Sequence, residues 1–223
     1  MNGQIIAPVL AIENLNVWYG QGPYEVHVVR DVSLTLNPGE RLGLVGESGS
    51  GKTTTILAAM GLLPSSAQVS GRILLNGQDI LAGGDRSIAV HRWKNIAMVF
   101  QGAMNAFNPV KTIEWQIIEA MQVHGIASGK AAAARVEDLL RLVGIPVGSA
   151  RLYPHQFSGG MRQRAMIAMA LACGPKVLLA DEPTTALDVM VQDQVLKLLV
   201  RLSKELDLAV ILVTHDLGIV AEN

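Results

Sequence analysis

The sequence predicts an α/β fold: a mainly parallel sheet at the core, a small antiparallel β layer beside it, and a helical lobe inserted in the core. Three observations support this prediction. Apolar runs of strand length recur along the chain, and each ends at a glycine-rich or polar segment. A glycine-rich loop links one of these runs to a helix-forming stretch at residues 54–60. From about residue 102 to 172 the apolar spacing is helical instead.

Length and composition fit one domain, residues 1–223, with the lobe inserted at approximately 102–172. A hydrophobic content of 50% in 223 residues is ample for a buried core. The chain holds 18 Lys and Arg against 19 Asp and Glu, without a basic run, and only 4% of its residues are aromatic. We therefore expect no nucleic-acid partner.

Cysteine usage and the length of the apolar runs limit the chemistry and the location. Cys173 is the only cysteine, which excludes an intramolecular disulfide and a cysteine-built metal site, and its apolar surroundings indicate a small buried hydrophobe. The longest apolar runs have about ten residues, fewer than the roughly 18 that cross a bilayer. No basic-then-apolar signal sequence opens the chain. We expect a cytoplasmic protein whose link to a membrane goes through a partner.

The first part of the chain predicts short strands. They cover Val9–Val17, Val26–Leu36 and Leu42–Val45, with Asn37-Pro38-Gly39 as the turn before the third. Another strand covers Gly71–Gly77 and ends in an Asn-Gly turn. These segments suggest the small antiparallel layer beside the core.

The second part alternates buried strands with helices. Continuous apolar runs predict buried strands at Asn95–Phe100, Val177–Ala180 and Leu208–Val213. Helices of the inserted lobe are predicted near 112–124, 130–143 and 160–172, separated by glycines and prolines. A long amphipathic helix then carries apolar residues at spacings of three and four, from Leu187 to Leu206.

The glycine-rich loop has the spacing of a phosphate cradle. Residues Gly46–Thr53 match G-x-x-x-x-G-K-[ST], the P-loop pattern of nucleoside triphosphatases. Its glycines let successive backbone N–H groups turn toward a phosphate, and the following helix N-terminus favours the same anion. Lys52 supplies a point charge for the β- and γ-phosphates, and the Thr53 hydroxyl a ligand for Mg²⁺. We therefore predict a P-loop NTPase core.

Polar residues follow three other apolar runs: Gln101, the pair Asp181-Glu182, and His215. Because the carboxyl ends of parallel strands share one edge of a sheet, we expect these groups to converge on the loop. Asp181 is suited to hold Mg²⁺ opposite Thr53, and Glu182 to orient or deprotonate an attacking water. Two adjacent carboxylates are costly to desolvate without a cation, which disfavours a plain solvated turn.

A second helix start is also suited to an anion. Ser158 is a good N-cap residue, and Gly159-Gly160 leave backbone N–H groups free at the start of an apolar helix. On this segment alone, simple helix capping remains the favoured interpretation.

Three segments together resemble the nucleotide-binding subunit of an ATP-binding-cassette (ABC) transporter: Tyr153–Arg164 (YPHQFSGGMRQR), Ala180–Asp188 (ADEPTTALD) and His215. The similarity runs from about residue 10 to the end. Gln101 followed by Asn105–Pro109 resembles the oligopeptide, dipeptide and nickel importers within that family. The resemblance implies an ATP-hydrolysing motor subunit of an importer for peptides or nickel, bound peripherally at the cytoplasmic face of the inner membrane.

The resemblance also implies a role for each matching residue. Gly46–Thr53 would be the Walker A loop, Val177–Asp181 Walker B, and Ser158–Met161 the signature sequence. Tyr19 would stack on adenine, although the strand register decides between it and Trp18. The catalytic residues implied are Glu182, His215 and Gln101, and those at Mg²⁺ are Thr53, Gln101 and Asp181. The ATP-binding residues implied are Tyr19, Gly46, Glu47, Ser48, Gly49, Ser50, Gly51, Lys52, Thr53, Thr54, Ser158, Gly159, Gly160 and Asp188.

Partners follow from the same resemblance. ATP would lie between the Walker A loop of one subunit and the signature helix of a second ATP-binding subunit, in a head-to-tail homo- or heterodimer. Integral membrane permease subunits and, indirectly, an extracytoplasmic substrate-binding protein would complete the importer. His215 would be the switch histidine of the family, and members of the family normally continue past it, so we expect these 223 residues to be C-terminally truncated.

Two alternatives use the same loop. A non-transport ABC ATPase of DNA repair or translation would carry long coiled-coil insertions, tandem cassettes or a basic face, and the sequence has none of these. A P-loop small-molecule kinase would not explain the Ser158 helix start or the Glu182 carboxylate. The cargo is not encoded in these motifs, so peptide and nickel both stay open.

Overall fold

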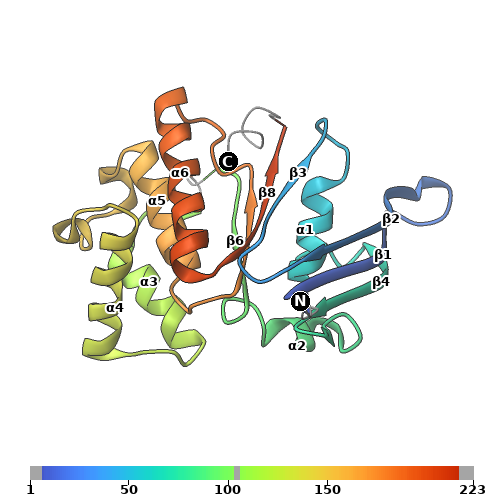
Figure 1. Cartoon of the computed structure of the whole chain (residues 1–223), viewed down its shortest axis with the longest axis horizontal. Coiled ribbons are helices and arrows are strands. Elements are labelled where there is room, and N and C mark those ends of the chain that lie inside the picture. The colour runs from blue at the N-terminus through green and yellow to red at the C-terminus, as the bar shows by residue number, and fades with distance from the viewer. Residues whose placement is uncertain (1–6, 103–105, 216–223) are drawn as a thin grey trace, which may run out of the picture.

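A computed structural model describes residues 7–102 and 106–215 of the chain. Its parallel sheet has the strand order β3-β8-β7-β6, and its antiparallel sheet the order β2-β1-β4-β5. The antiparallel sheet and helix α1 lie on one side of the parallel sheet, and helices α3, α4 and α5 lie on the other (Figure 1). The predicted fold class is confirmed: an α/β core with a mainly parallel sheet, a small antiparallel layer and a helical lobe.

The elements have the following bounds. The strands are β1 (Leu10–Tyr19), β2 (Val26–Leu36), β3 (Arg41–Val45), β4 (Gln68–Leu75), β5 (Gln78–Asp79), β6 (Ile96–Val99), β7 (Val177–Asp181) and β8 (Ala209–Thr214). The helices are α1 (Lys52–Met60), α2 (Gly84–Ala89), α3 (Ile113–Val123), α4 (Gly129–Leu142), α5 (Gly159–Ala170) and α6 (Val189–Leu206). Within the described ranges, none of these helices combines the length and the apolar character that a membrane span requires.

Two details of the predicted elements differ in the structure. The long helix was predicted to include Leu187, but α6 begins at Val189, because the Asp188 side chain caps it by accepting a hydrogen bond from Val191 N. Ala186 has a φ of 66°, a left-handed conformation that a helix does not continue through. Neither β5 nor α2 was predicted, since both are very short and lack a clear apolar period.

Three strands of the parallel sheet, β6, β7 and β8, are buried on both faces, and their alternate residues belong to two hydrophobic clusters. In β6, Ala97 and Val99 pack in the cluster that includes the helical lobe and α6. Ile96 and Met98 pack in the cluster that includes α1 and the antiparallel sheet. Burial on both sides explains why these strands appear in the sequence as continuous apolar runs.

The helical lobe has no separate core among the described residues. Side chains of α3, α4 and α5 share one cluster with α6 and with one face of the parallel sheet. Cys173 is buried next to this cluster, and burial raises the pKa of its thiol to about 11, in keeping with the predicted small hydrophobe. The predicted single domain also includes 1–6, 103–105 and 216–223, which lie outside the described residues, so those bounds stay a prediction.

Candidate active site

The carboxyl ends of the parallel strands bring the predicted polar groups together. The glycine-rich loop follows β3, Gln101 follows β6 by two residues, Asp181 ends β7, and His215 follows β8. The pairs Val45↔Thr214 and Asp181↔Val213 show that these strands end nearly level. The expected convergence at one edge of the sheet is therefore present.

The loop leaves the first turn of α1 open to a ligand. Helices α3, α5 and α6 each begin with a side chain that caps a backbone N–H group, whereas α1 begins after Gly51 without a side-chain cap. Gly49 and Gly51 have φ values of 81° and 92°, which only glycine adopts without strain. The uncapped N–H groups and the helix dipole therefore favour an anion at this point.

Lys52 lies inside the loop. Its ammonium group donates hydrogen bonds to Gly46 O at 2.7 Å and to Glu47 O at 2.6 Å, and the residue is only 8% exposed. A Cβ at Gly46 would lie 2.9 Å from Ser50 Oγ, so a larger residue would fill the interior of the loop. The interior is a glycine-lined cradle that holds a cation, which fits a phosphate group of ATP.

The remaining loop positions surround this cradle. Glu47, Ser48, Gly49 and Ser50 are exposed, and Thr54 is half-buried in the first turn of α1. Their exposure is compatible with the predicted contact to nucleotide.

Thr53 and Asp181 form an oxygen-rich pair across the site. The Thr53 hydroxyl donates to Asp181 Oδ1 at 3.1 Å, and Asp181 is only 4% exposed. Burial raises the pKa of Asp181, which the Thr53 hydrogen bond partly counters. Mg²⁺ prefers hydroxyl and carboxylate oxygens with the rest of its shell from water and phosphate, so the pair fits this ion. Among the described residues, no cluster of three or more His, Cys, Asp or Glu side chains forms a protein-only metal site.

Replacing Asp181 by Asn should stabilise the protein in the absence of nucleotide and metal. The folded-state pKa is raised, so the carboxyl binds its proton more tightly in the folded state, and its ionisation at neutral pH destabilises the fold. We expect the thermal midpoint of Asp181→Asn to exceed that of the wild type by about 2–4 °C at neutral pH, corresponding to about 1 kcal/mol. Mg²⁺-ATP should stabilise the variant much less than the wild type.

The pH dependence of the thermal midpoint tests the predicted direction of the effect of Asp181→Asn. Between neutral pH and the ordinary carboxyl range near pH 4, the wild type takes up its proton in the folded state first. The gap between the two midpoints should therefore close as the pH falls through the raised folded-state pKa. Thermal denaturation in chelator across this range measures it, and a gap that widens toward low pH would contradict the expectation.

Glu182 has an unusual backbone and three polar neighbours. Its φ is 41°, a strained conformation that often marks functional positions. Gln101 Nε2 donates to Glu182 Oε2 at 2.9 Å, and the Thr185 hydroxyl donates to the same oxygen at 3.0 Å. His215 Nδ1 lies 3.5 Å from Oε1. The three predicted catalytic residues are thus in contact, and Thr185, which was not predicted, is the fourth member of the group.

The two candidates for the adenine partner have different surroundings. Trp18 stacks on His27 with ring centroids 4.4 Å apart. Tyr19 packs against the cluster of the antiparallel sheet and α1, together with Val28. A Cβ at Gly51 would lie 3.0 Å from Val28 O, so this part of β2 adjoins the end of the glycine-rich loop. The arrangement favours Tyr19, and its role at adenine stays a prediction.

The start of α5 agrees with capping and leaves further donors. Ser158 Oγ accepts a hydrogen bond from Met161 N at 3.2 Å, as the capping interpretation predicts. Helix geometry leaves the N–H groups of Gly159 and Gly160 without an intrahelical acceptor. A Cβ at Gly160 would lie 2.6 Å from Val191 Cγ1, so this helix start packs closely against α6 of the same chain. Among the described residues, no hydrogen bond joins Ser158 to the Walker A loop of its own chain.

A groove lies at the boundary between the parallel sheet and the helical lobe. Its volume is about 380 Å³ and its lining is mostly apolar: Trp93, Met98, Phe100, Gln101, Gly102, Ala106, Met166, Met169 and Ala170. Phe100 is 41% exposed there. Because Gln101 lines the groove and also contacts Glu182, this groove adjoins the predicted catalytic residues. Asn105, part of the segment that resembles peptide and nickel importers, lies outside the described residues.

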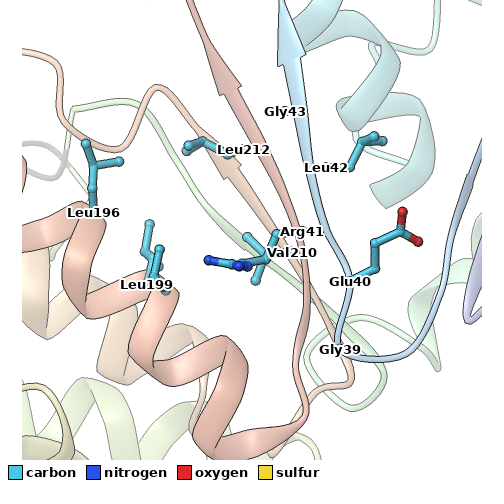
Figure 2. Close-up of a pocket in the computed structure, with 10 residues that line it drawn as sticks. Gly39, Glu40, Arg41, Leu42, Gly43, Leu196, Leu199, Val210 and Leu212 are labelled. Carbon is cyan, nitrogen blue, oxygen red and sulfur yellow. The ribbon is translucent and has the colours of Figure 1, made fainter. Parts of the chain in front are cut away.

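A second hollow lies elsewhere in the sheet. It has a volume of about 300 Å³ and lies between α6 and strands β3 and β8, where Leu196 and Leu199 face Leu212 and Val210 (Figure 2). Most of its lining is aliphatic or glycine, and it contains none of the predicted site residues. We therefore place the candidate active site at the strand ends and not in this hollow.

Comparison with known proteins identifies the family. The model of the ABC transporter family matches residues 29–185. The chain is 49% identical over 218 residues to the dipeptide transport ATP-binding protein DppD of Bacillus subtilis, covering 96% of this chain and 65% of that protein. It is 45% identical over 216 residues to the oligopeptide transport ATP-binding protein OppD of Haemophilus influenzae, covering 96% of this chain and 67% of that protein.

A solved structure has the same fold. The ATP-binding cassette MJ0796, solved as a dimer in a post-hydrolysis state bound to ADP and Pi, matches with a TM-score of 0.82 and 29% identity. The match covers 94% of this chain and 89% of that one. The chain thus spans about two thirds of the length of the two transport relatives and most of an isolated cassette. By its motifs, its fold and these matches, the chain belongs to the ABC transporter family.

Proposed function

We propose that this chain is the ATP-hydrolysing motor subunit of an importer for di- or oligopeptides. The observation that carries the proposal is that Thr53 contacts Asp181, and Gln101 contacts Glu182, at the carboxyl edge of the parallel sheet. The names of the two transport relatives support peptides over nickel as cargo. ATP is the substrate and Mg²⁺ the cofactor of the proposed reaction.

Each residue of the site has its own role in the proposed reaction. The loop N–H groups and Lys52 hold the β- and γ-phosphates, which requires the Lys52 ammonium to leave Gly46 O and Glu47 O. Thr53, Asp181 and Gln101 would hold Mg²⁺, which would neutralise charge on the phosphate oxygens. Glu182 orients the attacking water and accepts its proton. His215 contacts the γ-phosphate beside Glu182.

A second subunit completes each nucleotide site in this proposal. The N–H groups of Gly159 and Gly160 form a second helix start that can bind an anion. Among the described residues, no hydrogen bond joins Ser158 of this helix start to the Walker A loop of its own chain. If the start of α5 binds the γ-phosphate of ATP that is held by the Walker A loop of a partner subunit, both anion sites of each chain have a ligand. Asp188, at the start of α6 beside the exposed Val189 and Met190, then lies at the dimer interface.

The groove beside Gln101 supports a contact with permease subunits. Its exposed Phe100 and its methionines offer an apolar surface that an amphipathic helix of a membrane subunit can fill. Gln101 lines the groove and also donates to Glu182, so a helix bound in the groove would contact the catalytic carboxylate through this one residue. Such a contact would attach the chain peripherally to the inner membrane at its cytoplasmic face. An extracytoplasmic binding protein would then deliver the cargo.

The runner-up is a non-transport ABC ATPase of DNA repair or translation, in which the same site would drive a clamp. The balanced charge of −1 and the transport names of the relatives favour the importer.

The experiment that tests the proposal is transport in reconstituted vesicles. Proteoliposomes that hold the chain with its permease subunits, supplied with the binding protein, should accumulate a labelled di- or oligopeptide only when Mg²⁺-ATP is present on the subunit's side. Lys52→Ala should abolish accumulation, and Thr35→Val, an exposed change in β2, should leave it unaltered. Uptake of Ni²⁺ in place of peptide would correct the cargo. Hydrolysis stimulated by DNA or ribosomes without any transport would favour the runner-up.

A further inference from the structure

The Glu182 carboxylate is held asymmetrically. Its Oε2 atom accepts two hydrogen bonds, from Gln101 Nε2 at 2.9 Å and from Thr185 Oγ1 at 3.0 Å. Among the described residues, its Oε1 atom has a single polar neighbour, His215 Nδ1 at 3.5 Å. The Glu182 side chain is 20% exposed, so part of it still reaches solvent. When one oxygen of a carboxylate accepts two hydrogen bonds, the side chain is held in one orientation. The other oxygen then remains available to accept a proton as a general base.

The turn that carries Thr185 is fixed by the backbone. Thr185 N donates to Glu182 O at 3.2 Å, with Pro183 between them, and Glu182 N donates to Val213 O of β8 at 3.0 Å. Glu182 and Ala186 both have positive φ values, 41° and 66°, which bracket the turn. The turn therefore brings the residue three positions after Glu182 back onto its carboxylate and ties both to the sheet.

The two donors on Oε2 differ in what the proposed function asks of them. Gln101 is exposed and is assigned to Mg²⁺, which its Oε1 atom would ligate, so the position of its amide depends on the metal as well as on Glu182. Thr185 is on the same turn as Glu182 and has no such second task. The hydrogen bond from Thr185 to Oε2 therefore does not depend on nucleotide or metal.

We infer that Thr185 is a positioning residue for the proposed hydrolysis: its hydroxyl holds Glu182 Oε2 so that Oε1 faces the attacking water. The inference rests on the proposed function, because it assigns Glu182 as the base. It adds a residue that acts through the carboxylate and does not touch ATP. A hydrogen bond to a charged group that matters for orientation should change turnover and leave nucleotide binding in place.

The test compares Thr185→Val with Thr185→Ser in the full chain, using steady-state hydrolysis of Mg²⁺-ATP and equilibrium binding of ATP. The valine side chain keeps the shape and removes the hydroxyl, so we expect kcat to fall about 10- to 100-fold, with KM and the dissociation constant of ATP changed by no more than about twofold. The serine variant keeps the hydroxyl and should recover turnover to within about threefold of the wild type. Thr35→Val, an exposed threonine of β2, is the matched control for the Thr-to-Val change.

Two further variants separate positioning from a structural effect. In a Glu182→Gln background the carboxylate is already gone, so adding Thr185→Val should change the residual rate by less than about twofold. Thr185→Ala removes the hydroxyl with a smaller side chain and replaces the valine variant if that one does not fold. Thermal midpoints of all variants identify any loss of folding.

The outcomes separate this inference from the proposed function. If the wild type hydrolyses ATP, Glu182→Gln is slow, and removal of the Thr185 hydroxyl leaves kcat unchanged, then only the role of Thr185 is wrong. The same conclusion follows if the serine variant is as slow as the valine variant, or if Thr185→Val slows the Glu182→Gln background as much as the wild type. If the wild type does not hydrolyse ATP, or Glu182→Gln hydrolyses it at the wild-type rate, both the proposed function and this inference fall.

Discussion

Glu182→Gln should leave ATP bound and lower the single-turnover rate of hydrolysis by about 10²–10⁴-fold. The amide keeps the size of the side chain and can still accept the Thr185 hydrogen bond, but it no longer takes a proton from water. Because orientation and proton transfer matter in the transition state, the loss appears in the rate and not in nucleotide affinity. ATP that is bound but not cleaved should then hold two subunits together as a stable dimer.

The measurements are single-turnover hydrolysis and size analysis of the same sample with Mg²⁺-ATP. Glu119→Gln, an exposed glutamate of α3, is the matched control and should behave as the wild type in both assays. Hydrolysis by Glu182→Gln at a rate close to that of the wild type would move the base to another residue. A slow variant that stays monomeric with ATP would keep Glu182 as the base and remove the ATP-held dimer.

The parts of the site that could be predicted are those where one strand and one polar residue follow each other in the sequence. The apolar runs before Gln101, Asp181 and His215 are continuous because strands β6, β7 and β8 are buried on both faces, so their ends were easy to locate. The run before Gly46 was located by the glycine-rich loop that follows it. The edge that the groups share follows from a parallel sheet. The strand order β3-β8-β7-β6 was not predicted, since nothing in a single strand says which neighbour it pairs with.

The parts that were missed depend on local backbone geometry. Thr185 reaches Glu182 because a turn with positive φ at Glu182 folds the chain back, and propensity rules do not anticipate a left-handed glutamate. The one available signal was the spacing: a hydroxyl three residues after Glu182 with a proline between. Leu187 was assigned to the long helix because its spacing fits the apolar stripe, although the Asp188 cap starts the helix two residues later.

The choice between Trp18 and Tyr19 shows a similar limit. An ideal strand alternates its side chains, so the face of each aromatic would follow from the register. In β1 the register to β2 shifts between Ile12 and Leu15, between Leu15 and Val17, and between Val17 and Trp18. Bulges of this kind break the two-residue period, and the sequence does not mark them.

The largest loss of activity is expected from a lesion in either anion site, and combining the two lesions tests which subunit each site serves. Lys52→Ala removes the cation from the phosphate cradle, and Ser158→Arg places a long side chain where the second helix start would meet the γ-phosphate. Each variant alone, as a homodimer, has two damaged sites and should be nearly inactive. A dimer of one Lys52→Ala chain with one Ser158→Arg chain differs, because in a head-to-tail arrangement both lesions fall on the same composite site. The opposite site then keeps its lysine and its serine.

Nucleotide occupancy of this mixed dimer, purified through a different tag on each chain, should be one tightly bound ATP per dimer, with part of the turnover retained. The matched control carries both changes in one chain and pairs it with the wild type. In that dimer the lesions are divided between the two sites, so both sites should bind ATP weakly.

If the Ser158 helix instead served the cradle of its own chain, the two results would be exchanged, because the mixed dimer would have two damaged sites and the control one intact site. If it only capped its own helix, Ser158→Arg would lower the thermal midpoint and leave ATP occupancy dependent on Lys52 alone. Equal occupancy in the two dimers would therefore contradict recognition of ATP across the subunit boundary.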